Sequence, residues 1–208
     1  RGGFIHPRQT FRINHFLEVE NMNTSMDKTR FITVAGMLSA LATVLYYLGE
    51  VPMPFAANLK IGFSDLPALI GGIIMGPAAG VTVEIVQNIL HLFRTDTVGI
   101  GEICNCAVGI GMVLPFSLLF RKLREKHSIY VAYLFGSLVS LVGIVVSGLV
   151  INALMYPIYM MLIGGAIESA TVFFVYLGGT AVTNVIKWVV TLVPIALIVK
   201  PLLKIRWT

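Results

Sequence analysis

A single lysine interrupts the last long apolar stretch of the chain, at Lys187 in the segment TNVIKWVV. The stretch is long enough to span a membrane, where an ionisable side chain is costly enough to indicate a functional site with a partner. One helical sector of about 60° holds a set of polar side chains, namely those of Thr180, Asn184, Lys187 and Thr191. Because such a stripe must face protein or a cavity, we expect it to bind a polar ligand. The alternatives are structural pairing and a lysine that extends to the membrane surface.

A second polar stripe lies in the apolar stretch 77–93. Its members recur at the helical spacing i, i+3, i+4 and i+7, and they are Glu84, Gln87, Asn88 and His91. Two polar helix faces imply a shared interior. For Glu84 and Gln87 the alternative is hydrogen bonding between helices, a common use of polar residues in membranes. We expect His91 to lie at the membrane interface and not to act in catalysis.

Side-chain amides on other apolar stretches add to this interior. Asn105 lies in the stretch 100–120, and Asn152 lies in the stretch 128–163 with Tyr156 one helical turn beyond it. An amide both donates and accepts hydrogen bonds, which suits a neutral heterocycle with alternating carbonyl and N–H groups. These residues therefore indicate recognition of such a ring.

Motifs for enzymatic chemistry are absent from the sequence. The chain has no P-loop, no HExxH and no G-x-S-x-G, so nothing in it indicates ATP hydrolysis or peptide cleavage. Cys104 and Cys106 are spaced poorly for a disulfide and lack a second Cys/His cluster for zinc, so we expect them to pack as small apolar residues. The halves show no convincing repeat of the kind usual in secondary transporters. We expect a ligand-binding membrane subunit, without a cofactor, that another protein powers.

The composition is that of an integral membrane protein, because 57% of the 208 residues are hydrophobic, 12% are charged and the mean hydropathy is +0.87. The apolar residues come in long separate blocks, as in membrane-spanning helices, and not in the short alternating segments of a barrel. The predicted fold is all-α with six transmembrane helices, at 31–49, 66–76, 77–93, 100–120, 128–163 and 180–200. Pro157 kinks or ends the fifth block, and 164–179 is ambiguous. Prolines and a glycine in 50–65 predict a structured loop or short hairpin.

The distribution of charge predicts the orientation of these helices. The basic residues expected on one side are Lys28, Arg30, Arg121, Lys122, Arg124, Lys126, Lys200, Lys204 and Arg206. The other side has only Lys60 and Arg94, beside several acids. The positive-inside rule therefore places both termini in the cytoplasm and the loop 50–65 outside, and it explains the net charge of +5 without a nucleic-acid partner. On this topology Asn184 and Lys187 lie in the outer half of the last helix.

The first residues lack an initiator methionine and an apolar core. We expect 1–27 to be a poorly ordered tail, either artificial or an upstream extension, with Met22 or Met26 as a natural start. The segment 28–208 would form the six-helix, substrate-binding membrane domain.

Three segments resemble a known family. They are LKIGFSDLPALIGGIIMGPAAGVTVEIVQNILHLF at 59–93, VGIGEICNCAVG at 98–109 and NVIK at 184–187. They are similar to the riboflavin-specific (RibU-type) S components of energy-coupling factor (ECF) transporters, and the resemblance covers roughly residues 30 to 200. It implies a multi-pass protein of a prokaryotic cytoplasmic membrane that takes up a vitamin and is not an enzyme.

The resemblance also implies a site, in which riboflavin enters from outside and binds between the loop after the first helix and helices four to six; FMN stays open. The residues that it assigns to this site are Asn184, Lys187, Asn152, Tyr156, Leu59, Asp65, Asn105 and Asn88. Of these, Asn184 and Lys187 would bond the polar edge of the isoalloxazine ring. The alternatives are an S component for another vitamin, and a proton-coupled transporter or channel that uses Lys187 and Glu84.

The family further implies partners, namely a transmembrane coupling subunit and two cytoplasmic ATPases. Its docking sign is a pair of small residues four apart on the first helix, and this chain has Gly36 and Ala40. Small residues permit close helix approach, although an internal packing face has the same spacing.

Overall fold

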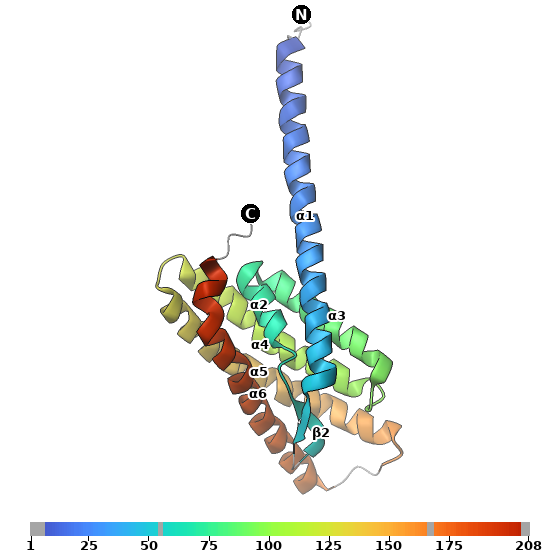
Figure 1. Ribbon diagram of the computed structural model, residues 1–208. Helices are drawn as coiled ribbons and strands as arrows, with labels where there is room; N and C mark the ends of the chain where they lie inside the picture. The colour runs from blue at the N-terminus through green and yellow to red at the C-terminus, as the bar shows by residue number, and fades with distance from the viewer. Residues whose placement is uncertain (1–6, 54–55, 166–168, 205–208) are drawn as a thin grey trace, which may run out of the picture. The chain divides into compact units, whose positions relative to one another are not determined.

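The computed structural model describes the backbone of residues 7–53, 56–165 and 169–204, and the side chains of 28–53, 61–165 and 169–204. Its elements are α1 (Pro7–Gly49), β1 (Val51–Met53), β2 (Ala56–Ile61), α2 (Leu66–Ile74), α3 (Pro77–His91), the 3-10 turn η1 (Leu92–Arg94), α4 (Ile100–Arg124), α5 (Ile129–Leu162) and α6 (Ala170–Lys204) (Figure 1). The mostly helical fold that we predicted is confirmed. Contacts divide the chain into Arg1–Val34 and Ala35–Thr208, and the core and cavities described below belong to the second unit.

Four of the described helices are long and apolar enough to cross a membrane: Lys28–Gly49 within α1, and α4, α5 and α6. The helices α2 and α3 have 9 and 15 residues, fewer than the roughly 20 that a complete crossing needs. The six predicted helices are thus present, but two of them are too short for a full span of their own. Six crossings, cytoplasmic termini and an extracellular loop stay predictions.

The loop expected at 50–65 contains an antiparallel hairpin. β1 pairs with β2 with Val51 opposite Ile61 and Pro52 opposite Lys60, as the hairpin alternative predicted. Proline is tolerated here because β1 and β2 form a two-stranded sheet in which each strand is an edge. β2 packs against α6, so the hairpin lies beside the helix that carries Lys187.

The last helix begins ten residues earlier than the predicted start at 180. α6 starts at Ala170, so most of the ambiguous segment 164–179 is helical, and Lys187 lies midway between the ends of α6. Its place in the outer half of a membrane span stays a prediction. Two glycines, Gly178 and Gly179, obscured this start, since each disfavours a helix by about 1 kcal/mol. α5 does not end at Pro157 but continues to Leu162.

Residues 7–27 of the expected tail are also helical, because α1 begins at Pro7. The division of the chain into a tail, 1–27, and a membrane domain, 28–208, stays a prediction.

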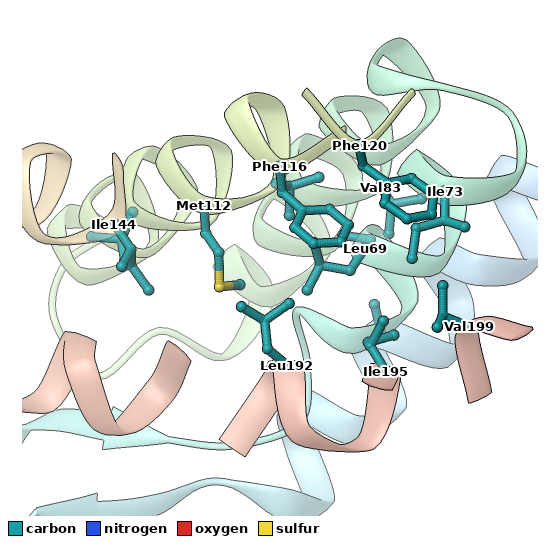
Figure 2. Close-up of a cluster of buried hydrophobic side chains, with 14 of the residues drawn as sticks. Leu69, Ile73, Val83, Met112, Phe116, Phe120, Ile144, Leu192, Ile195 and Val199 are labelled. Carbon is teal, nitrogen blue, oxygen red and sulfur yellow. The ribbon is translucent and has the colours of Figure 1, made fainter. Parts of the chain in front are cut away.

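The apolar core joins α2, α3, α4 and α6 beneath the polar residues. Figure 2 shows Phe116 and Phe120 of α4 directed toward Leu69 of α2, with Leu192 and Ile195 of α6 on the opposite side. The rings of Phe116 and Phe120 stack with their centroids 5.5 Å apart, and both side chains are buried. Because α2 packs against both α4 and α6, it holds these two helices at a spacing at which polar residues farther along them can meet.

Truncation of the core should separate these helices. We expect Phe116→Ala to lower the free energy of unfolding by about 3–5 kcal/mol, because it leaves a cavity between α2, α4 and α5. The matched control is Ile103→Ala on the same helix, where the side chain is 52% exposed. Unfolding in mixed detergent micelles, followed by circular dichroism, measures both; equal losses would contradict this core assignment.

Candidate ligand-binding site

A cavity of about 110 Å³ lies between α1, α4, α5 and α6. Five of the residues that the sequence assigned to a ligand site line it, namely Asn105, Asn152, Tyr156, Asn184 and Lys187. They come from three helices that are distant in sequence, so the fold brings them together. Their contact with a ligand stays a prediction.

Lys187 is buried at the cavity wall with two partners behind it. Its Nζ lies 2.8 Å from Oδ2 of Asp65 and donates to Oδ1 of Asn105 at 2.6 Å. The side chains of Lys187 and Asp65 are 5% and 0% exposed, so the ion pair is shielded from solvent. Lys187 is therefore paired structurally, as one alternative supposed, and it also lines the cavity.

Asp65 itself is not among the lining residues of the cavity. It stands immediately before α2, at the end of the loop that was expected to cover a ligand, and its side chain is directed to Lys187. In this arrangement it supplies the counter-charge for the lysine. The side chain of Leu59, the other residue expected from this loop, is outside the described residues.

A chain of amides orients Asn105 toward the lysine. Asn105 donates through Nδ2 to Oδ1 of Asn88 at 2.9 Å, and Asn88 donates to the backbone carbonyl of Glu84 at 2.8 Å. Because Nδ2 of Asn105 is directed to Asn88, its oxygen faces the ammonium of Lys187. Asn88 lies behind the cavity wall and reaches the cavity only through Asn105.

Glu84 and Gln87, on the second predicted stripe, lie away from the cavity lining. Nε2 of Gln87 donates to Oε2 of Glu84 at 2.5 Å, within α3 and not between helices as the alternative supposed. Gly109 of α4 faces the Glu84 carboxylate and leaves no room for a side chain there. A larger residue at this position would have to displace the buried carboxylate of Glu84.

Aromatic rings of α5 and α6 form another part of the cavity lining. Tyr156 of α5 lies 4.6 Å from Tyr176 and 5.7 Å from Phe173, both of α6, measured between ring centroids. The hydroxyl of Tyr176 donates to Oδ1 of Asn152 at 2.9 Å and so links α6 to α5 across the cavity lining. Sequence reasoning missed Tyr176 because it started the last helix at 180; the aromatic run FFVY at 173–176 was the available signal.

A second polar cluster lines another part of the cavity. Nδ1 of His91 lies 2.9 Å from Oε1 of Glu102, and the hydroxyls of Thr95 and Thr97 donate to the other carboxylate oxygen at 2.9 and 3.2 Å. The ring of Tyr46 packs on His91 at 3.7 Å between centroids. His91 is buried and lines the cavity, and its place at the membrane interface stays a prediction. We had not expected Glu102 in the site.

The remaining sequence predictions fall outside the cavity or at its edge. Cys104 lines the cavity and Cys106 does not; both are free and partly buried. Gly36 and Ala40 are exposed on α1, and a Cβ at position 36 would meet no atom within 4 Å. The alternative of an internal packing face is therefore not realised at these two residues among the described contacts.

Known proteins are similar to this chain in sequence and in fold. The sequence model of one protein family, the substrate-specific component of ECF transporters, matches residues 30–199. The riboflavin transporter FmnP of Bacillus subtilis (strain 168) is 37% identical over 114 residues, 53% of this chain and 60% of that protein, so the chain spans less than two thirds of this relative. The riboflavin transporter RibU of Staphylococcus aureus (strain TCH60) is 27% identical over 170 residues, 81% of this chain and 87% of that protein.

A solved structure described as the S component of a bacterial ECF transporter has the same fold. It superposes with a TM-score of 0.70 at 24% sequence identity, and the alignment covers 87% of this chain and 99% of the other. This structural likeness establishes only the fold. Membership of the family rests on the family model, which matches most of the chain. With its long apolar helices around a polar cavity, the chain belongs to the substrate-specific components of ECF transporters, which are membrane transport subunits and not enzymes.

Proposed function

We propose that this protein is the riboflavin-binding subunit of an ECF-type vitamin transporter in a prokaryotic cytoplasmic membrane. The observation that carries the proposal is the cavity, whose lining combines one buried ammonium, several amides and tyrosine rings. Two relatives named as riboflavin transporters support the choice of ligand.

The polar wall fits the pyrimidine edge of a flavin ring. That edge alternates carbonyl oxygens with an N–H group, and the amides of Asn184 and Asn152 can both donate and accept. An ammonium has three N–H groups, and Lys187 directs two of them to Asp65 and Asn105. The third is left for a ligand carbonyl oxygen, and this bond would be charge-assisted.

The aromatic wall fits the face of the same ring. Tyr156 and Tyr176 present large apolar surfaces that can pack on a planar heterocycle. The cavity of about 110 Å³ is smaller than the roughly 300 Å³ at which small-molecule pockets begin, so binding must widen it. Separation of Tyr176 from Asn152, which bond across the lining, would widen the cavity between α5 and α6.

Energy for transport would come from partners, namely a transmembrane coupling subunit and two cytoplasmic ATPases. The exposed small residues Gly36 and Ala40 offer a face on α1 where helices of another subunit can approach closely. In this proposal the chain crosses the membrane six times with both termini in the cytoplasm, and the hairpin lies on the outer side near the ligand. A proton-coupled transporter that uses Lys187 and Glu84 together has less support, because Glu84 lies off the cavity.

Riboflavin should bind with strong quenching of its fluorescence, because its ring would lie against tyrosines and amides. Titration of the detergent-purified protein with riboflavin measures this directly. Thiamin and biotin, added as competitors, test for an S component of another vitamin. Displacement of riboflavin by either one at equal concentration, or no quenching at all, would contradict the assignment.

Lys187→Met should weaken riboflavin binding about 10- to 150-fold, the equivalent of the roughly 1.5–3 kcal/mol of a charge-assisted hydrogen bond. Because this change leaves Asp65 buried without its counter-charge, the double variant Asp65→Asn with Lys187→Met is measured beside it. The double variant should recover stability but not binding.

Thr191→Val is the matched control for these lysine variants. Thr191 is buried one turn along the same stripe, bonds the carbonyl of Lys187 and does not line the cavity. It should keep the wild-type dissociation constant. Normal affinity in the folded double variant would remove Lys187 from the site.

Gly36→Leu with Ala40→Leu should leave riboflavin binding intact and abolish ATP-dependent uptake in proteoliposomes, because leucines would hold a docking helix away. Ala78→Leu, which adds the same bulk to an exposed alanine of α3, should keep uptake. Co-purification of the coupling subunit gives an independent reading of docking. Uptake at the wild-type rate in the double variant, or a parallel loss of binding, would exclude this face as the docking surface.

A further inference from the structure

A second hollow, of about 720 Å³, lies over one face of α4 and shares no lining residue with the ligand cavity. Leu118, Lys122 and Glu125 of α4 line it at helical spacing, with Pro115 one turn earlier. Val139 of α5 and Pro77 at the start of α3 form its sides. We call this hollow the α4 groove.

Most of the α4 groove is apolar and open to the surroundings. Leu118 is 53% exposed and Val139 is 42% exposed, and Pro115, Leu119 and Pro77 complete an apolar wall. Because α4 and α5 are long and apolar enough to span a membrane, we expect this wall to face the hydrocarbon of the bilayer. A hydrocarbon chain is the occupant that such a surface fits.

One end of the α4 groove is basic. Arg121 and Lys122 lie in the last turn of α4, where the apolar part of the helix ends and the headgroup region begins. The guanidinium of Arg121 lies against the backbone of Gly76, where an added Cβ would be 2.6 Å from Nη1. Gly76, at the α2–α3 junction, has φ of 104°, which favours glycine. Because glycine has no side chain, the guanidinium of Arg121 can lie there, at the rim of the groove.

We propose that the α4 groove binds an anionic phospholipid, with an acyl chain along Leu118 and Val139 and the headgroup phosphate at Arg121 and Lys122. Arginine bonds phosphate through two parallel N–H groups, and the lysine adds a second positive charge. With Glu125 as the one acid in the lining, the net charge of the groove is positive. A lipid with a net negative headgroup is therefore preferred to a zwitterionic one.

The lining argues against a helix of a protein partner in this groove. Close packing of membrane helices uses small residues, whereas the walls here are leucine, valine and proline. The exposed small residues of α1, Gly36 and Ala40, fit a helix better.

The test compares phosphatidylglycerol with phosphatidylcholine on the full-length purified protein. Delipidated protein is titrated with each lipid in detergent, and native mass spectrometry gives the fraction with one lipid bound. We expect phosphatidylglycerol to bind on the order of tenfold more tightly than phosphatidylcholine, and Arg121→Gln with Lys122→Gln to remove this preference. Riboflavin binding by the variant reports that it is folded.

The control removes the same charge from the same segment. Arg124 packs over the ring of Phe120, and neither Arg124 nor Lys126 lines the α4 groove. Arg124→Gln with Lys126→Gln should keep the preference for phosphatidylglycerol. Val139→Trp, which fills the groove without a change of charge, should weaken binding of both lipids.

Three results would overturn the proposal. An equal loss of preference in the control would mean that general surface charge attracts the lipid. Equal binding of the two lipids by the wild-type protein would remove the headgroup site. Unchanged lipid binding with loss of the coupling subunit in Arg121→Gln with Lys122→Gln would assign the groove to a protein partner.

Discussion

The ion pair between Lys187 and Asp65 is the constraint on which the rest of the structure depends. Lys187 lies midway along a largely apolar helix, where an unpaired charge would be expensive. Asp65 offsets its charge at 2.8 Å, and Asn105 accepts a hydrogen bond from the same ammonium. Because removal of one partner from such a pair costs about 3–5 kcal/mol, the pair ties the segment before α2 to the middle of α6.

The surrounding elements can be understood as means of holding this pair in place. The packing of α2 against both α4 and α6 sets the distance between these two helices. Hydrogen bonds between Asn88 and Asn105 and between Asn105 and Lys187 connect α3 to the lysine through α4. A cation that lines the cavity thus keeps a defined position, and under the proposed function its remaining N–H group would bond a neutral ring.

Much of the site was predictable because polar residues in apolar helices have few reasons to be there. The stripe Thr180, Asn184, Lys187 and Thr191 is buried as helical spacing predicted, and so are Glu84, Gln87, Asn88 and His91. The proline at the start of α3 and the hairpin after α1 were also evident, since each rests on local backbone preferences.

Other features depend on tertiary packing that local patterns do not encode. Glycines hid the first ten residues of α6, and Tyr176 was lost with them. Hydropathy did not distinguish a full crossing from the two short helices α2 and α3. Nor did the sequence show that Asp65 faces the lysine instead of the cavity, since this depends on how the segment before α2 meets α6.

We propose that Lys187 and the neighbouring amides form hydrogen bonds with the polar edge of a flavin ring. The most direct test compares riboflavin with its N3-methyl derivative, which differs only in the N–H group of that edge, by fluorescence titration of the wild-type protein. A large loss of affinity on methylation is the predicted result, because the methyl group removes a donor and clashes with the buried amides. Equal affinity for the two compounds would contradict the account.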